Sequence, residues 1–360
     1  MNILKKHKRP TVCIIGHGWW GRGLKRMLRM QNYNIIVFTS KTALTDLLKV
    51  ECDLVFECTG DPEICRAVAE MCLLIKVNLM TVNSEFDCHW GFFYDKLFKS
   101  QNLVYCGCAG DQPGCIYKLA GEVKFMGFSI IVAGTCKGFI DKYQTPKGVT
   151  KWCKVGHNPD KICSFADGTK LNIEAAVMCN VLNLVPDVRG MHGLNCTKDE
   201  LLEAFPRVIN TEGVVDYTLG VKGINQEAGV FVIGKLKNNN QAFRDDLQYL
   251  KLGAGPYYLF FRDYHLCYFE AAESVVKLVE LGIPYYTSSH MNADVSAVAK
   301  RDIKQGIELG GIGSADIYGE IDTVKRMADN KQLSVVECKG QVLHRDILKD
   351  EPITEDMICM

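Results

Sequence analysis

The feature that most constrains the fold is a glycine-rich turn close to the start of the chain. An apolar run at residues 12–15 leads into Gly-His-Gly-Trp-Trp-Gly at residues 16–21, and residues 24–30 have helical periodicity. In such a strand–turn–helix the first glycine permits a tight turn, the second lets a pyrophosphate approach the backbone, and the third lets helix and strand pack closely. The helix N-terminus adds oriented N–H groups and a favourable dipole. A second apolar run at residues 35–38 completes the context, so the pattern predicts a dinucleotide site.

Strand and helix patterns continue to alternate after this unit. Apolar runs at residues 53–57, 77–82 and 103–106 are typical of buried strands, and residues 64–73 and 92–100 of helices. This order predicts an α/β fold with a Rossmann-type parallel sheet covered on both faces. Ligands of such sheets lie at the carboxyl ends of the strands, which is where Thr59, Asn83, Glu85 and the predicted turn at residues 107–114 fall.

The end of the second predicted strand bears on which dinucleotide is bound. An NAD site usually has an Asp or Glu there for the ribose 2′-hydroxyl, whereas this chain has Phe-Thr-Ser-Lys-Thr at residues 38–42. Hydroxyls and a lysine suit a 2′-phosphate better, so we expect NADP to be preferred over NAD. The predicted cofactor-binding residues are Gly16, Gly18, Trp19, Trp20, Gly21, Thr39, Ser40, Lys41, Thr59, Gly60, Asn83 and Glu85.

Composition narrows the classes of partner. The 360 residues carry 42 basic and 42 acidic side chains, which gives no reason to expect nucleic-acid binding. No apolar run is long enough to span a membrane, and residues 1–10 lack the apolar region of a secretory signal. The 17 cysteines show neither Cys-x-x-Cys nor zinc spacing, so we expect reduced thiols in a cytoplasmic protein. A homo-oligomer, most simply a homodimer, is expected from general frequency alone.

The rest of the chain predicts a mixed α+β domain followed by a small β-rich one. Residues 129–133, 230–234 and 257–261 are strand-like, and residues 167–180 predict a turn leading into an amphipathic helix with Asp167 as its N-cap. Residues 298–309 recur approximately at residues 342–354, which predicts a pseudo-symmetric clip. We therefore expect a dinucleotide-binding domain at 1–128, a catalytic domain at 129–290 and a third domain at 291–360.

Several short blocks in a consistent order resemble one family. They are residues 15–23, Glu-Cys-Thr-Gly at 57–60, Ala-Gly-Asp-Gln-Pro-Gly at 109–114, Ser-Phe-Ala-Asp-Gly-Thr-Lys at 164–170, residues 184–193, 229–232, 249–258 and 262–266. With them the chain resembles SAF-domain oxidoreductases related to homoserine dehydrogenase, a group that includes 1-deoxy-D-xylulose 5-phosphate reductoisomerase-like enzymes. The resemblance implies an NAD(P)-dependent redox enzyme whose third domain is SAF-like, and it leaves the substrate open.

Two departures from that family's pattern concern the substrate. Homoserine dehydrogenases have Asp-Val-x-Gly-x-Asp followed by a lysine, and here His192 replaces the second aspartate while Cys196 stands at the lysine's place. Homoserine and aspartate semialdehyde are therefore not expected as substrates. The lysine- and asparagine-rich loop of the reductoisomerase-like enzymes is also altered, at residues 136–143, so their substrate is not assured either.

Hydride transfer to a carbonyl requires a donor to the developing alkoxide. Lys170 is the first candidate, and the alternative is a solvated lysine paired with Glu174 at i, i+4. Lys137 is a second candidate donor. Asp167 and His192 are further catalytic candidates, the latter as an acid or base titrating near neutrality.

The remaining polar side chains allow several ligands. We expect Asp111, Arg189 and His265 to contact substrate, and Lys251 and Arg262 offer further cationic groups, with ordinary surface pairing as the alternative. Carboxylates at strand ends and turns would favour Mg²⁺ or Mn²⁺ if they converged, which spacing cannot decide; they are Glu85, Asp87, Asp111, Asp167 and Asp187.

Together these features predict an NAD(P)-dependent oxidoreductase for a small, hydroxylated, anionic carbonyl compound, for example a sugar phosphate with coupled isomerisation. Two alternatives stay open. One is a simple dehydrogenase of a polyhydroxy acid or sugar intermediate, and the other is a non-catalytic nucleotide-binding protein.

Overall fold

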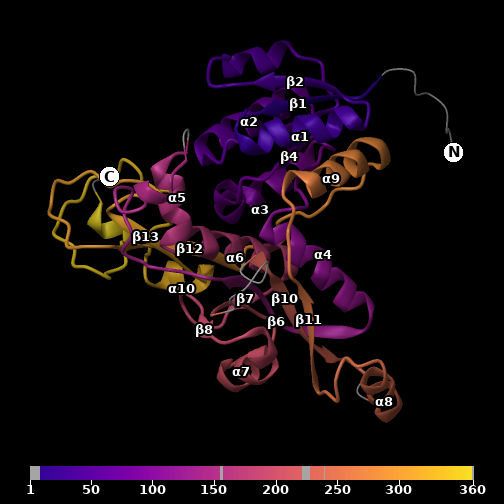
Figure 1. Ribbon diagram of the computed structural model, residues 1–360. Coiled ribbons are helices and arrows are strands. Elements are labelled where there is room, and N and C mark those ends of the chain that lie inside the picture. The colour runs from indigo at the N-terminus through magenta and orange to yellow at the C-terminus, as the bar shows by residue number, and fades with distance from the viewer. Residues whose placement is uncertain (1–8, 155–156, 221–227, 239, 359–360) are drawn as a thin grey trace. The chain divides into compact units, whose positions relative to one another are not determined.

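The computed structural model describes residues 9–154, 157–220, 228–238 and 240–358 (Figure 1). The chain forms two compact units. Unit 1 comprises residues 1–114 and 266–289, and unit 2 comprises residues 115–265 and 290–360. The expected boundary at 290 lies within one residue of a division between the units, whereas the expected boundary at 128 does not: the first division follows residue 114. Residues 266–289 return to unit 1, and residues 290–360 belong to unit 2 together with residues 115–265.

Unit 1 is the parallel α/β unit that the sequence predicts. Its elements are β1 (Thr11–Ile15), α1 (Trp19–Met30), β2 (Asn34–Phe38), η1 (Leu44–Lys49), β3 (Leu54–Glu57), α2 (Pro62–Ile75), β4 (Leu79–Thr81), α3 (Ser84–Ser100), β5 (Tyr105–Gly107) and α9 (Tyr268–Leu281). The five strands pair in the order β2-β1-β3-β4-β5, and every pair is parallel. The α/β prediction with a Rossmann-type parallel sheet is thereby confirmed.

Both faces of this sheet are packed, as a parallel sheet requires. One buried cluster contains Val12 and Ile14 of β1 with residues of α1 and α9, and another contains Cys13 with residues of α2 and α3. Figure 1 shows α1 and α9 side by side. Their close approach depends on Gly23, because a Cβ atom there would lie 2.3 Å from the ring of Tyr268.

One predicted turn is instead partly helical. The sequence predicts a turn at residues 107–114, but α4 (Gln112–Phe125) begins inside that segment. Pro113 is compatible with this because a proline near the start of a helix loses no intrahelical hydrogen bond. Gly114 has little space, since a Cβ atom would lie 2.4 Å from the carbonyl oxygen of Cys108.

Unit 2 is built on a mixed sheet, as expected for an α+β domain. Its larger elements are β6 (Phe128–Lys137), α5 (Pro159–Ala166), α6 (Thr169–Leu182), β9 (Val214–Leu219), β10 (Val230–Leu236), α8 (Gln241–Tyr249), β11 (Tyr257–Arg262), β12 (Ala293–Ala299), β13 (Ile317–Thr323) and α10 (Val324–Asp329). Its shorter elements are η2 (Thr150–Trp152), β7 (Val185–Pro186), β8 (Leu194–Asn195), η3 (Lys198–Glu200), α7 (Leu201–Val208) and η5 (Glu355–Met357). The sheet order is β11-β10-β6-β9-β7, with β8 also paired to β9.

Helix α6 differs from the amphipathic helix that the sequence predicts, because almost all of its side chains are buried. Asp167 is also not its N-cap: it follows α5, Gly168 with φ +85° precedes α6, and the Asp167 side chain accepts a hydrogen bond from the backbone N–H of Thr169 at 2.8 Å. The carboxylate therefore still satisfies one N–H group of the first turn of α6.

Polar side chains of α6 hold the β12–β13 hairpin. Thr169 accepts a hydrogen bond from the backbone N–H of Gly319, and Asn172 accepts one from that of Ile321, both at 2.9 Å. At the other end of the helix Asn180 accepts the N–H groups that lead into β12. These residues occupy backbone groups along the hairpin that would otherwise be left without partners.

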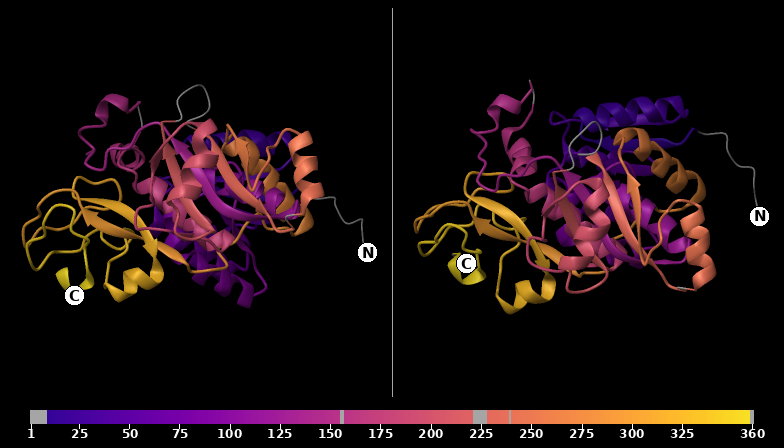
Figure 2. Two further views of the ribbon diagram at one scale, coloured as in Figure 1. Left: turned by 90° about the horizontal axis from the view of Figure 1, so that it is seen from below. Right: turned by 60° about the horizontal axis from the view of Figure 1, so that its bottom comes forward.

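The C-terminal repeat is a true structural repeat, in which residues 297–309 correspond to residues 341–353. Ile303 and Ile347 exchange two backbone hydrogen bonds of 2.9 Å across the pseudo-twofold axis. Other backbone hydrogen bonds between the halves come in matched pairs. With the N–H donor named first, they are Leu309 to Gln341 with Ile353 to Ala297, Ala299 to Glu351 with Leu343 to Ile307, and Gly306 to Leu343 with Asp350 to Ala299. The predicted pseudo-symmetric clip is confirmed, although only its first half begins in a regular strand, β12. In Figure 2 the yellow segment is mostly loop.

Side chains follow the same pseudo-symmetry. Asp302 accepts the backbone N–H of Lys349 at 2.8 Å, and its counterpart Asp346 accepts that of Gln305 at 2.9 Å. One position breaks the symmetry: Lys300 is buried, whereas its counterpart in the second half, a histidine, is exposed.

Candidate functional site

A cavity of about 770 Å³ lies in unit 1 at the carboxyl ends of β1, β2 and β3. We call it the glycine-turn cavity. Its lining residues are Ile15, Gly16, His17, Gly18, Phe38, Thr39, Ser40, Thr42, Leu44, Cys58, Thr59 and Ile64. The strand order places it beside the paired strands β1 and β3, after which the chain continues in opposite directions along the sheet, to β2 and to β4. Ligands bind at such a point in open α/β sheets.

Each glycine of the turn has the role that its position predicts. Gly16 adopts φ +107°, a conformation that favours glycine. Gly18 precedes α1, and a Cβ atom at Gly18 would meet no atom within 4 Å, so its backbone is open to an approaching ligand. Gly21 is a packing position, because a Cβ atom there would lie 2.0 Å from the carbonyl oxygen of Gly16.

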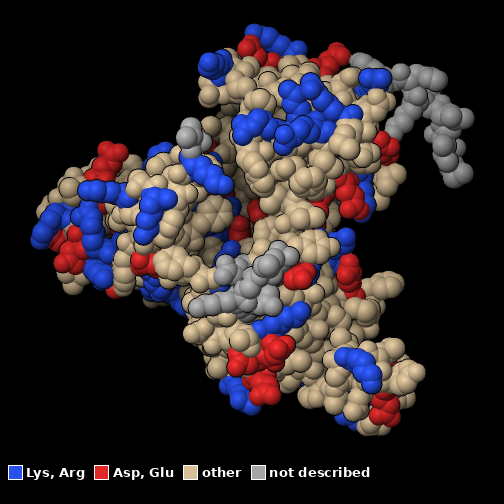
Figure 3. Space-filling view, viewed as in Figure 1, with Lys and Arg blue, Asp and Glu red and all other residues tan. Residues whose placement is uncertain are grey.

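The first turn of α1 has the electrostatics of an anion site. It contains no acidic residue, and the N–H groups of a first helical turn lack intrahelical partners. Figure 3 shows Lys and Arg side chains gathered over α1, which carries Arg22, Lys25, Arg26 and Arg29. This basic surface and the open backbone of Gly18 fit a phosphorylated ligand.

Thr59, one of the lining residues, is held by a buried carboxylate that the sequence does not single out as a site residue. Glu57, at the end of β3, is fully buried and accepts hydrogen bonds from the backbone N–H of Thr59 at 2.6 Å and from its hydroxyl. Thr81 donates a third hydrogen bond at 3.0 Å. Burial raises the pKa of Glu57, although the donors oppose that shift. Thr59 thus presents to the cavity an oxygen whose own proton points to Glu57.

Other predicted cofactor residues do not line the cavity. Lys41 is exposed beside it, and Gly60 adopts φ +66° just beyond Thr59. Asn83 caps α3, with its side chain accepting the N–H of Phe86 and donating to the carbonyl of Asp61. Glu85 lies in the first turn of the same helix.

The two tryptophans of the turn have an aromatic environment within unit 1. The rings of Trp19 and Trp20 lie edge-on to the ring of Tyr268, with centroids 5.0 and 6.5 Å away. Neither side chain lines the glycine-turn cavity. Their contact with a cofactor stays a prediction.

A second cavity, of about 250 Å³, lies in unit 2, and we call it the polar cavity. Its lining residues are Ile140, Lys142, Asp167, Gly168, Asn172, Arg189, Gly190, Met191, His192, Tyr217, Tyr318, Gly319 and Glu320. Three of the predicted site residues, Asp167, Arg189 and His192, are therefore brought together although they are distant in sequence.

His192 is held by a carboxylate. Its Nε2 lies 2.8 Å from Oδ2 of Asp187, a carboxylate that also accepts the backbone N–H of Asn210 at 2.8 Å. Burial raises the pKa of Asp187, but the hydrogen bonds from Asn210 and His192 outweigh it and lower that pKa overall. An ionised Asp187 fixes the Nε2–H form of the imidazole and leaves Nδ1 to act on a ligand.

Two cations of the polar cavity share one carboxylate. Lys142 Nζ lies 2.6 Å from Glu320 Oε1, and Arg189 Nε lies 2.7 Å from Glu320 Oε2. Burial raises the pKa of Glu320, and the two cations more than compensate, so the pKa is lowered. Sequence reasoning missed Glu320 and Tyr217, because nothing in the local sequence of β13 or β9 signals a site.

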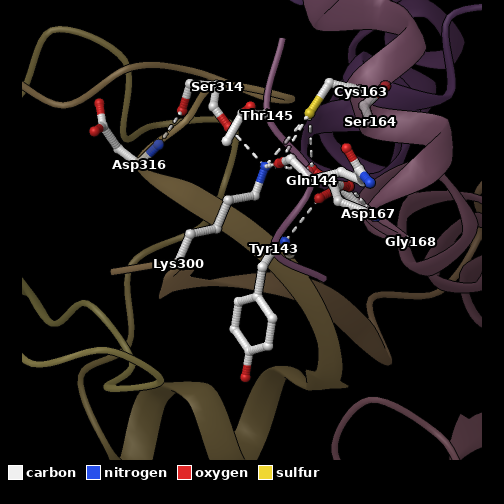
Figure 4. A network of polar contacts seen from close by, with 12 residues as sticks. Tyr143, Gln144, Thr145, Cys163, Ser164, Asp167, Gly168, Lys300, Ser314 and Asp316 are labelled. Carbon is white, nitrogen blue, oxygen red and sulfur yellow. Dashed lines mark hydrogen bonds and ion pairs between the residues drawn. The ribbon is translucent and has the colours of Figure 1, made fainter. Parts of the chain in front are cut away.

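The predicted Asp167 is paired with Lys300, which the sequence places in a turn of the repeat. Lys300 Nζ lies 2.8 Å from Asp167 Oδ2, and both side chains are almost completely buried. The ammonium also donates to the carbonyls of Gln144 at 2.7 Å and Ser314 at 2.6 Å, and lies 3.5 Å from Cys163 Sγ (Figure 4). Burial raises the pKa of Asp167 against the opposing effect of Lys300.

The two predicted alkoxide donors converge on one carboxylate of α6. Lys170 Nζ lies 3.9 Å from Oε1 of Glu174, and Lys137 Nζ lies 3.9 Å from Oε2. Glu174 and Lys170 are buried, so the alternative of a solvated lysine is wrong in its exposure, although the pairing with Glu174 that it included is present. No local pattern indicates that Lys137, on β6, reaches the same group.

The remaining predicted ligands are dispersed. Asp111 precedes α4 in unit 1 and accepts the N–H of Gln112 at 3.1 Å. In unit 2, His265 Nδ1 lies 2.9 Å from the carbonyl oxygen of Ala228, and Arg262 lies over the ring of Tyr264.

The carboxylates considered for a metal do not converge. Within the described ranges no group of three or more His, Cys, Asp and Glu side chains is arranged to hold a metal ion. Asp87 illustrates why: it is buried, accepts hydroxyl hydrogen bonds from Tyr105 and Ser288, and its pKa is raised to about 6 by burial. Among the same residues no helix has the length and apolar character to cross a membrane, and the 16 cysteines found there form no disulfide.

Comparison with known proteins identifies the class of chemistry. Residues 110–271 match the family model described as the catalytic domain of oxidoreductase DRL. The chain is an oxidoreductase. The expectation of an enzyme is thereby confirmed, and the non-catalytic alternative is set aside. No curated protein matches the chain.

Several solved structures are similar in fold. One is a hyperthermophilic archaeal homoserine dehydrogenase in complex with NADPH, which has 10% sequence identity to this chain and a TM-score of 0.46. The match covers 77% of this chain and 99% of the archaeal chain. A homoserine dehydrogenase from Thiobacillus denitrificans is 11% identical, with 95% and 98% covered and a TM-score of 0.44. Biliverdin reductase from Synechocystis sp. PCC 6803, in complex with biliverdin and NADP⁺, is 11% identical, with 76% and 92% covered and a TM-score of 0.39.

Proposed function

We propose that this oxidoreductase uses NADP in preference to NAD and acts on a small, hydroxylated, anionic carbonyl compound. The observation that carries the proposal is the glycine-turn cavity, with its open backbone at Gly18 and with Thr39, Ser40 and Thr42 at the end of β2. Among the described residues no carboxylate lines the cavity there, whereas an NAD site usually places one against the ribose 2′-hydroxyl.

The residues around the glycine-turn cavity would each bind a different part of the cofactor. The first turn of α1 and the backbone of Gly18 would hold the pyrophosphate, and the hydroxyls of Thr39 and Ser40 would take the 2′-phosphate. Thr59, oriented by Glu57, would contact a hydroxyl or amide N–H of the cofactor. When bound, the nicotinamide supplies a hydride to the substrate carbonyl, or accepts one in the reverse direction.

The catalytic role proposed for the lysines follows from the carboxylate that they share. Lys137 and Lys170 both lie 3.9 Å from Glu174, which brings two ammonium groups to one carboxylate. Such a group of charges stabilises a developing alkoxide, and a lysine N–H can donate its proton to that oxygen. His192, held by Asp187, is the second candidate for this proton transfer.

Two glycines offer a matched test of the cofactor assignment. A Cβ atom at Gly18, or at Gly121 in α4, would meet no atom within 4 Å, but only Gly18 lines the cavity. We expect Gly18→Val to weaken NADPH binding by at least about tenfold, since one displaced contact of about 1.4 kcal/mol suffices. Gly121→Val should leave it unchanged.

Calorimetric titration with NADPH and NADH, alongside thermal unfolding, provides the measurement. Equal loss in both variants, or no measurable NADPH binding by the wild type, would contradict the proposal. A tighter affinity for NADH than for NADPH would overturn the cofactor preference alone.

A further inference from the structure

The charged side chains of the polar cavity indicate the charge of the ligand that it can bind. Lys142 and Arg189 both bond to Glu320, at 2.6 and 2.7 Å. Two cations and one carboxylate leave a single positive charge on this wall. The side chain of Glu320 is 10% exposed, whereas those of Lys142 and Arg189 are 49% and 32% exposed, so water screens the charges of the cluster only in part.

The other groups around the cavity add no positive charge. Asp167 is neutralised by Lys300 at 2.8 Å, and His192, in its Nε2–H form, is bonded to the ionised Asp187 at 2.8 Å. Asp216, which is buried, accepts the backbone N–H groups of His192 at 3.1 Å and of its neighbour in sequence at 2.9 Å. None of these groups supplies a second positive charge.

The donors that remain available suit a planar anion with hydroxyl groups. Arg189 bonds to Glu320 through Nε alone, and its terminal N–H groups have no other partner among the residues described. The hydroxyl of Tyr217 and Nδ1 of His192 likewise have no hydrogen-bond partner among the residues that the structure describes. The terminal N–H groups of a guanidinium match the two oxygens of a carboxylate, while a hydroxyl and an imidazole nitrogen suit substrate hydroxyls.

We propose that the polar cavity binds a hydroxycarboxylate monoanion and discriminates against phosphate dianions. The single positive charge of this wall balances one carboxylate, whereas a dianion would leave a negative charge without a partner in a partly buried site. The inference rests on the proposed function, because it takes the polar cavity, which His192 lines, to be the place where the substrate binds. It favours a polyhydroxy acid over a sugar phosphate as the compound acted on.

A matched pair of three-carbon ligands tests the discrimination without turnover. D-glycerate and glycerol 3-phosphate both carry two hydroxyl groups beside the anion, and at pH 8 the phosphate is a dianion. We expect calorimetric titration of the wild-type protein to show glycerate bound at least about tenfold more tightly.

Glu320→Gln should weaken or reverse the discrimination, because it removes the negative charge of Glu320 and leaves the two positive charges of Lys142 and Arg189 on the wall. The ratio of the two dissociation constants should then move toward glycerol 3-phosphate by about tenfold or more. Glu203→Gln is the control: it is the same substitution in unit 2, at a side chain that is 75% exposed and outside the cavity lining. It should leave the ratio at the wild-type value.

Three results would overturn the inference: tighter binding of the phosphate by the wild type, no binding of either ligand up to high millimolar concentration, or an unchanged ratio in Glu320→Gln. NADPH titration is run separately on the same protein. Failure there with discrimination intact would reject the cofactor assignment and leave the ligand class standing, so the two proposals fail independently.

Discussion

The buried pair of Lys300 and Asp167 allows one substitution to be predicted quantitatively. Replacing Lys300 by methionine keeps most of the side-chain volume but removes the ammonium, whose nitrogen bonds to the Asp167 carboxylate and to the Gln144 and Ser314 carbonyls. Both charged side chains are 2% exposed or less. Removing one partner of such a pair leaves an uncompensated buried charge, which costs about 3–5 kcal/mol.

That loss should be visible in thermal and urea denaturation followed by circular dichroism. Each kcal/mol lowers the Tm of a unit of this size by about 2–4 °C, so Lys300→Met should lower it by about 6–20 °C. The double variant Lys300→Met, Asp167→Asn should recover about 2 kcal/mol relative to the sum of the single losses, because it removes the orphaned charge.

An exposed pair provides the control for this prediction. Lys304 pairs with Asp346, but the two side chains are 78% and 55% exposed, and Lys304→Met should leave the unfolding free energy unchanged within the error of the measurement. A loss below about 1 kcal/mol in Lys300→Met, or additive losses in the double variant, would refute the reasoning.

Three further predictions concern the two cavities. Gly21→Ala should destabilise unit 1 by about 1–3 kcal/mol in denaturant titrations, since its methyl group would lie 2.0 Å from the Gly16 carbonyl oxygen, a backbone atom. The pKa of Glu320 is lowered, so its contribution to stability is present above the ordinary Glu value of about 4.3 and is lost as pH falls through the lowered pKa. Urea titrations should accordingly show Glu320→Gln less stable than wild type by about 2 kcal/mol at pH 7, and the difference should shrink as the pH falls below the ordinary Glu value. Thr39→Asp should lower the ratio of NADPH to NADH affinity by about tenfold in equilibrium titrations, because a carboxylate there accepts the ribose hydroxyls and repels the 2′-phosphate.

Each of these has a result that counts against it. Gly18→Ala meets no neighbouring atom, so equal destabilisation by Gly18→Ala and Gly21→Ala would contradict the packing role of Gly21. A Glu320→Gln difference that does not shrink as the pH falls below the ordinary Glu value would show that the carboxylate's charge is not its cause. An unaltered cofactor ratio in Thr39→Asp would mean that the end of β2 does not contact the ribose.

The sequence predicted unit 1 because each residue pattern used there reflects a local constraint on the backbone or on side-chain burial. The glycines at 16 and 21 are required by a positive φ and by a backbone contact, and apolar runs buried on both faces mark β1 and β3. Such constraints act over a few residues and are visible in sequence. The repeat was visible for the same reason, since its two halves form the same hydrogen bonds.

The polar cavity could be predicted only in part, because its walls come from distant segments. Arg189 and His192 belong to a recognisable block, but Glu320 becomes a site residue only when β13 pairs with β12 and docks on α6. Nothing in the sequence indicated that Lys300 would be buried, because a lysine in a charged tripeptide is normally exposed. Its burial depends on the partners that tertiary structure provides at Asp167, Gln144 and Ser314.

The matched hydrogen bonds of the C-terminal clip have a consequence for how its two halves can differ. The backbone hydrogen bonds named above between residues 297–309 and residues 341–353 occur twice with the partners exchanged, as contacts do across the interface of a twofold homodimer. The two subunits of a homodimer have the same sequence, whereas the two halves of the clip carry different residues at equivalent positions. One half anchors the fold through the buried Lys300, while the equivalent position of the other half is exposed.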